Sequence, residues 1–171
     1  MNIRSAEKKD LALVAHVAKT SYEDAFGEYF NFKDELEAEI QENRSEKYFE
    51  SVLGKDDILV AEVDEKIIGY LQFGEPSSDI QRVLVDDIQL KRLYILASFH
   101  NRGIGSKLID SMFAHESLSQ VNNVYVEVWK QNDKAVKLYK KFGFEFTGQQ
   151  RPFYEKGKIV GHDDMMVKHL S

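Results

Sequence analysis

Residues 93–109 (LYILASFHNRGIGSKLI) join a β-rich run to an amphipathic helix through a turn that contains two glycines and an arginine. Ile104, Leu108 and Ile109 follow the turn at helical spacing. Because the first amides of a helix carry partial positive charge, the turn is either a tight connection or a cradle for phosphate. It lacks the GK[ST] ending of a P-loop, and Leu108 occupies the last glycine position of the dinucleotide motif GxGxxG.

The sequence around this turn predicts a mixed α/β (α+β) domain. The expected strands cover residues 2–4, 57–63, 66–74, 86–95, 123–129, 144–148 and 163–169. The expected helices cover residues 9–21, 34–53 with a break near Asn43, 104–117 and 133–142. Residues 57–63 and 66–74 form a hairpin by the length of their turn. A loop with Pro152 and Gly157, ending in a GHDD turn, precedes the last strand. Antiparallel hairpins surround a single β-α-β unit, so a doubly wound sheet is not expected.

Composition and charge exclude several classes of function. The 171 residues carry a net charge of −6 and no cysteine, which excludes disulfides, thiolate metal sites and a cysteine nucleophile. An acidic chain is a poor nucleic-acid binder, and the histidines show no metal-ligand spacing. With no membrane-length apolar run and no signal sequence, we expect one cytoplasmic domain over residues 1–171 that binds neither membrane nor metal.

A second motif lies about two dozen residues after the turn. Residues 126–144 (VEVWKQNDKAVKLYKKFGF) place Glu127 on a strand and Asn132 and Tyr139 on the following helix. Together with residues 93–109, this motif resembles the GNAT superfamily of N-acetyltransferases, in which a Q/R-x-x-G-x-G/A turn precedes such a helix. Within it, the stretches TSYEDAF, KRLYILASFHNRGIGSKLI and DDMMVKHL are similar to the bacterial PaiA-type polyamine acetyltransferases. The resemblance implies a GNAT-like acyl-CoA N-acyltransferase fold, with a mostly antiparallel sheet and a splayed pair of strands at 86–95 and 123–129.

The resemblance also implies acetyl-CoA as cosubstrate. The backbone of the preceding strand would hydrogen-bond the pantetheine arm, through Leu93, Tyr94 and Ile95. The turn would hold the pyrophosphate, through Asn101, Arg102, Gly103, Ile104, Gly105 and Ser106. Asn132 would contact the cofactor and Lys141 a phosphate; the alternatives are a plain helix N-cap and a surface lysine.

For catalysis, the resemblance makes Tyr139 the general acid that protonates the leaving thiolate, and Glu127 the general base for the amine. A core aromatic and an exposed strand glutamate are the alternatives. The amide near Ile95 would stabilise the oxyanion. Without cysteine, we expect direct transfer in a ternary complex. Two positions depart from the family pattern: His100 replaces the usual Gln or Arg, and Lys91 replaces a glutamate of some relatives, leaving Glu127, Asp87 or a water as base.

The acceptor side is expected near Glu23, Asp24 and Tyr154. Acids beside aromatics suit a small cationic amine such as spermidine or spermine, and solvated charge over a hydrophobic cluster is the alternative. Other acceptors consistent with the motifs are a protein or peptide N-terminus and an aminoglycoside-type amine, and a non-catalytic CoA-binding regulatory module is a further alternative. The aromatic cluster of residues 26–32 fits either a homodimer interface or core packing.

Overall fold

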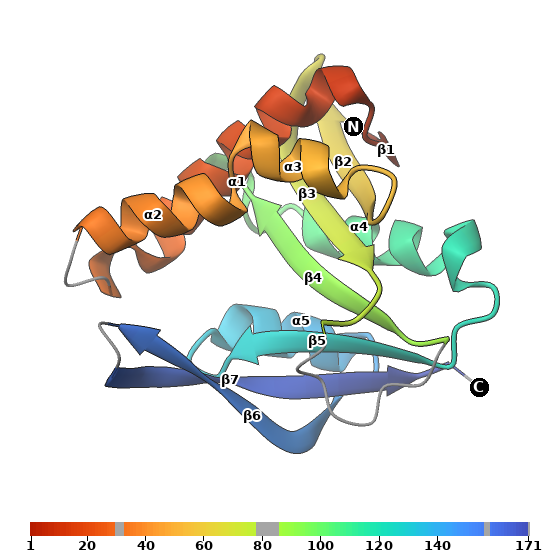
Figure 1. Ribbon diagram of the computed structural model, residues 1–171. Coiled ribbons are helices and arrows are strands. Elements are labelled where there is room, and N and C mark those ends of the chain that lie inside the picture. The colour runs from red at the N-terminus through yellow and green to blue at the C-terminus, as the bar shows by residue number, and fades with distance from the viewer. Residues whose placement is uncertain (30–32, 78–85, 156–157, 171) are drawn as a thin grey trace. The chain divides into compact units, whose positions relative to one another are not determined.

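The computed structural model describes residues 1–29, 33–77, 86–155 and 158–170, which fall into two compact units (Figure 1). The first unit spans residues 1–73 and 92–114, and the second spans residues 74–91 and 115–171. Strand β4 (Ile88–Ile95) begins in the second unit and ends in the first.

The sheet of the first unit starts with three antiparallel strands, β1 (Asn2–Ser5), β2 (Asp57–Val63) and β3 (Lys66–Gly74). Asp64 and Glu65 join β2 to β3 with φ angles of 49° and 62°. Positive φ at both central residues is the geometry of a two-residue type I′ turn, so the predicted hairpin is confirmed. The Leu96 N–H donates to the Ile68 carbonyl at 2.9 Å, which ties β3 to the end of β4.

Helices cover this part of the sheet. Helices α1 (Leu11–Phe26) and α3 (Glu46–Val52) pack on one face of β2 and β3, and their core consists of Leu11, Val14, Val17, Ala18, Phe49, Ile58, Val60, Ile67 and Tyr70. Helix α4 (Ile104–Phe113) contacts β1 and β2, where Leu59 and Ala61 point to the opposite face by alternation. The predicted helix 34–53 is two helices, because α2 (Lys33–Asn43) ends before Ser45, whose Oγ caps α3 by accepting from the Tyr48 N–H. The expected break near Asn43 is confirmed.

The second unit contains β5 (Asn123–Trp129), α5 (Asp133–Lys141), β6 (Glu145–Glu155) and β7 (Lys158–His169). The start of β4 pairs parallel with β5, from Ile88 opposite Val124 to Leu90 opposite Val126. Strand β7 is antiparallel to both β5 and β6, and β6 is the edge strand. The expected mixed, mostly antiparallel sheet is confirmed.

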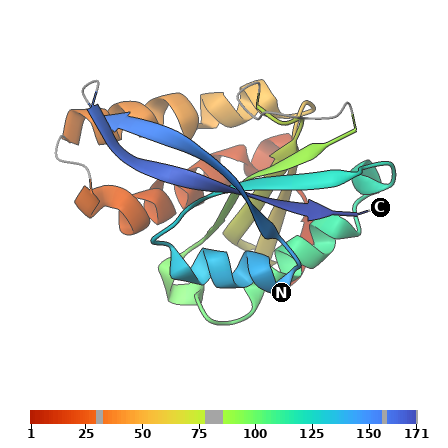
Figure 2. The ribbon, with the colours of Figure 1, turned by 90° about the horizontal axis from the view of Figure 1, so that it is seen from below.

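The β6–β7 hairpin corrects one prediction. The described residues of the expected loop between residues 149 and 162 are strand, in β6 and β7 (the blue strands of Figure 2). The GHDD run lies within β7, and Gly157 lies outside the described residues. Pro152 is tolerated because an edge strand has one side without a strand partner, where a missing N–H costs little. Two register shifts, between Phe146 and Gln150 and between Phe153 and Tyr154, bend the hairpin. None of the described helices is long and apolar enough to cross a bilayer.

Candidate functional site

The turn between β4 and α4 presents the first amides of a helix. Gly103 caps α4 with φ 74°, and Asn101 also has a left-handed φ of 60°. The first hydrogen bond of the helix runs from the Lys107 N–H to the Gly103 carbonyl at 3.1 Å. The first amides of an α-helix lie ahead of its first such hydrogen bond and point outward from its N-terminus. An added Cβ at Gly103 would meet nothing within 4 Å, so the positive φ, and not space, is what favours glycine there. The turn therefore has the backbone geometry of an anion site.

His100 ties this turn to the end of β4. Its ring Nε2 lies 2.8 Å from the Ile95 carbonyl oxygen. Because a carbonyl oxygen only accepts, Nε2 must carry the proton. The His100 N–H in turn donates to the Ala97 carbonyl at 3.1 Å. The residue that departs from the family pattern thus holds the last residue of the strand against the turn.

The end of β4 packs against tyrosines within the first unit. Tyr94 stacks on Tyr70 with ring centroids 6.0 Å apart and meets the edge of Tyr22 at 6.5 Å. Complete burial raises the pKa of Tyr70. The Arg92 guanidinium lies 4.3 Å above the Tyr48 ring. Leu93 and Ile95 alternate with these residues and are half-buried.

Helix α5 in the second unit carries three predicted site residues. Asn132 Oδ1 accepts from the Ala135 N–H at 3.2 Å, so the N-cap role is present, while the Nδ2 donors are not used by the cap. Tyr139 is buried against Phe144, with ring centroids 5.7 Å apart. Lys141 is exposed in the last turn of the helix. The core contact of Tyr139 and its predicted catalytic role are compatible, since its hydroxyl extends beyond the ring.

Glu127 on β5 is held by a cation. Its Oε2 lies 2.8 Å from Nη2 of Arg151 on β6, and its side chain is 12% exposed. Asp87, the other carboxylate considered as base, accepts from Asn123 Nδ2 at 2.8 Å and is 2% exposed. Asp87 therefore has a structural role just before the paired start of β4. The sequence predicted neither the ion pair of Glu127 with Arg151 nor the hydrogen bond from Asn123 to Asp87. Arg151 would have been recognised as a partner for Glu127 only if residues 149–155 had been assigned to a strand.

The predicted acceptor residues belong to both units, Glu23 and Asp24 to the first and Tyr154 to the second. Glu23 and Asp24 are exposed in the last turns of α1, with the Glu23 carboxylate 4.0 Å from the Lys19 ammonium. Asp24 lies about 200° around the helix from Tyr22, the residue that contacts β4. Tyr154 lies in β6 opposite Ile159, and its side chain is outside the described part of the structure.

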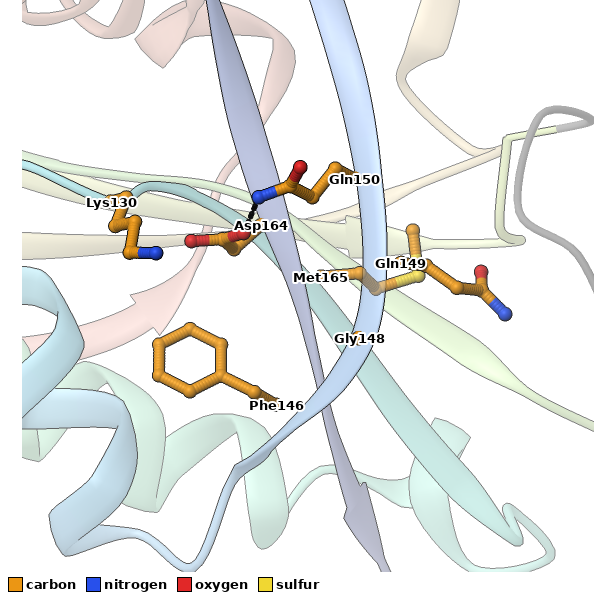
Figure 3. Close-up of a pocket in the computed structure, with 7 residues that line it drawn as sticks. All are labelled: Lys130, Phe146, Gly148, Gln149, Gln150, Asp164 and Met165. Atoms are coloured by element: carbon orange, nitrogen blue, oxygen red, sulfur yellow. Dashed lines mark hydrogen bonds between the residues drawn. The ribbon is translucent and has the colours of Figure 1, made fainter.

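A small pocket in the second unit was not predicted. It has a volume of about 260 Å³ and is lined by Lys130, Phe146, Gly148, Gln149, Gln150, Asp164 and Met165 (Figure 3). Gln150 Nε2 donates to Asp164 Oδ1 at 2.7 Å across its wall. Glu127, Asn132, Tyr139 and Tyr154 do not line the pocket, and the described residues contain no cluster that could hold a metal ion.

These features agree with comparisons to known proteins. The chain belongs to the GNAT acetyltransferase family, because residues 54–146, more than half of its length, match the acetyltransferase (GNAT) domain. An N-alpha-acetyltransferase of Sulfurisphaera tokodaii is 31% identical over 105 residues, which are 58% of this chain. The matched part spans only 63% of that relative's length.

Two further proteins are similar over shorter or more divergent stretches. The spermine/spermidine N(1)-acetyltransferase of Bacillus subtilis is 29% identical over 63 residues, or 36% of this chain and 41% of that protein. The crystal structure of a PaiA N-acetyltransferase from Thermoplasma acidophilum in complex with coenzyme A superposes with a TM-score of 0.77 at 19% identity, covering 98% of both chains. The GNAT fold expected from the resemblance is thereby confirmed.

Proposed function

We propose that this protein is an acetyl-CoA-dependent N-acetyltransferase that acts on a primary amine by direct attack in a ternary complex. The observation that carries the proposal is the extent of the family match, because residues 54–146 include both the turn before α4 and Tyr139. The glycine-containing turn at the N-terminus of α4 has a backbone geometry that fits a pyrophosphate. As before, we expect one cytoplasmic N-acetyltransferase domain over residues 1–171, and a homodimer stays an open prediction.

In this mechanism acetyl-CoA, when bound, supplies an activated thioester. The backbone of Leu93 to Ile95 binds the pantetheine arm, and the turn from Asn101 to Ser106 binds the pyrophosphate. Asn132, through Nδ2, and Lys141 add polar contacts to the cofactor. Glu127 accepts the proton that the acceptor ammonium must lose, directly or through water, and the Tyr139 hydroxyl donates a proton to the thiolate that leaves.

For the acceptor we propose a small cationic amine such as spermidine or spermine. Exposed Glu23 and Asp24 offer carboxylates for ion pairing, and the B. subtilis relative is named for this activity. A peptide N-terminus is the second candidate, and two observations favour it. The match to the N-alpha-acetyltransferase is longer, and Arg44 and Arg92 place positive charge against the tyrosines beside β4, which disfavours a polycation.

The experiment is a thiol-release assay with acetyl-CoA and a panel of spermidine, spermine, short peptides and an aminoglycoside. Tyr139→Phe should lower kcat by about 10²-fold or more while CoA still binds, because only proton donation is lost. Tyr70→Phe is the matched control: its hydroxyl is buried and has no hydrogen-bond partner among the described residues, so kcat should not change.

Each outcome has a defined meaning. No CoA release with any amine would refute catalysis and favour a CoA-binding module. Activity with peptides but not with polyamines would refute the polyamine acceptor. Loss of CoA binding in Tyr139→Phe would assign Tyr139 a structural role.

A further inference from the structure

Three charged residues share one face of the three strands β5, β7 and β6. Asp163 on β7 lies opposite both Trp129 on β5 and Arg151 on β6 in the strand register. Side chains alternate along each strand, so Glu127, Asp163 and Arg151 point to the same side, away from buried Val126 and Val128. Arg151 is therefore a cation shared by carboxylates on two neighbouring strands.

The ion pair between Glu127 and Arg151 is partly buried, which strengthens the interaction between the two charges. The Glu127 side chain is 12% exposed, whereas the Arg151 side chain is 47% exposed. Charge pairs at such partly buried positions are screened less than pairs in water. Burial raises the pKa of Asp163, the nearby Arg151 lowers it, and Asp164 raises it again.

We propose that Arg151 is a positioning residue for acetyl transfer: its guanidinium fixes the direction of the Glu127 carboxylate and keeps that carboxylate ionised to receive the acceptor's proton. The inference rests on the proposed function, in which Glu127 is the general base. The proton moves from the acceptor ammonium to a Glu127 oxygen, and the Arg151 ion pair favours the charged form that starts the step.

Other titratable groups lie on the same face of the sheet as Glu127. Tyr125 lies two residues away on β5, on the same face, and burial raises its pKa. Lys91 follows the last paired residue of β4 and shares its face with Gln89, which lies opposite Tyr125. By the same register, Glu145 of β6, opposite Val167, and His169 of β7 also lie on this face. Among the described residues, Arg151 lies at ion-pair distance from Glu127.

The test compares Arg151→Gln, Arg151→Lys and the control Lys137→Gln, which removes one exposed positive charge from α5 in the same unit. The readouts are the pH profile of kcat/KM, the pH dependence of the ¹³C signal of the Glu127 carboxyl carbon, and thermal unfolding. The acid limb of the profile and the NMR midpoint should both move up by about one pH unit in Arg151→Gln. The shift should be smaller in Arg151→Lys and absent in Lys137→Gln.

The two readouts separate the possible failures. An NMR midpoint that does not move in Arg151→Gln would overturn the proposal, because the ion pair would then have no effect on Glu127. A moved midpoint with an unmoved acid limb would overturn it too, since Glu127 would not be the base. A wild-type enzyme that acetylates no amine refutes the proposed function instead, even if the NMR shift is seen. Equal shifts in Arg151→Gln and Lys137→Gln would indicate a general charge effect and refute a specific role.

Discussion

Gly69 on β3 lies against the backbone of β4, so Gly69→Ala tests the packing of the strand that we propose to hold the pantetheine arm. A Cβ added at Gly69 would lie 3.0 Å from the Tyr94 carbonyl oxygen and 3.0 Å from Ile95 Cγ1. It would also lie 3.4 Å from Ile95 Cα. The Ile95 side chain can change its rotamer, but a strand carbonyl cannot move without displacing β4.

The size of the effect follows from these contacts. Overpacking costs about 1–3 kcal/mol, and a backbone clash belongs in the upper half of that range. The reduced freedom of the unfolded chain returns about 0.5 kcal/mol. We therefore expect the free energy of unfolding to fall by about 1.5–2.5 kcal/mol, which lowers Tm by about 3–10 °C in a chain of this size. Losing one or two hydrogen bonds to the cofactor would weaken CoA binding by about tenfold.

The matched control is Gly27→Ala. Gly27 has φ −56° and nothing within 4 Å of an added Cβ, so this variant should be neutral or more stable by about 0.5–1 kcal/mol. Urea unfolding measures stability, and titration calorimetry measures CoA affinity. If Gly69→Ala unfolds at the wild-type midpoint and binds CoA normally, β4 is not held as closely as these distances state, and the reasoning is refuted.

Two other predictions concern capping and charge. Arg4 holds the pKa of Asp10 below its usual range through hydrogen bonds of 2.6 and 3.1 Å, so this contribution is present at neutral pH and is lost as the pH falls through the lowered value. Asp10→Asn should lose about 2 kcal/mol at pH 7 and show a flatter acid dependence, and urea midpoints that stay parallel to wild type down to pH ~3 would contradict this. Asn132→Ala should cost about 1 kcal/mol of stability, whereas Asn132→Asp keeps the cap. Unchanged CoA affinity in Asn132→Asp, measured by calorimetry, would show that the amide does not contact the cofactor.

The elements predicted from sequence are those defined by neighbouring residues. The turn before α4 combines glycine at a left-handed position with apolar residues at helical spacing, and both are local properties. The β2–β3 hairpin is likewise set by Asp64 and Glu65 at its two-residue turn. The β6–β7 hairpin was missed because Pro152 and the charged GHDD run are typical of loops. These strands are held by pairing with each other, from Gln150 opposite Asp164 to Glu155 opposite Lys158, and β7 pairs with β5 only from Asp163 onward. The local sequence does not encode these pairings.

The ion pair of Glu127 with Arg151 could not be predicted for a related reason. It depends on the register of three strands, and a one-residue slip of β6 would move Arg151 to the other face. The register shift between Phe146 and Gln150 sets which β6 residues face Glu127. The sequence pattern contains no signal for such a shift, because its cause is the fit between strands.

The pairing of β4 with β5 distinguishes the two carboxylates that were considered as general base. Some relatives carry a glutamate at the position where this chain has Lys91. Glu127 and Asp87 are therefore the two carboxylates considered as general base. Asp87 precedes the paired start of β4 and is occupied by Asn123, whereas Glu127 lies on β5 just beyond the last residue paired with β4. The proposal that Glu127 is the proton acceptor therefore depends on its position on β5 and on its ion pair with Arg151.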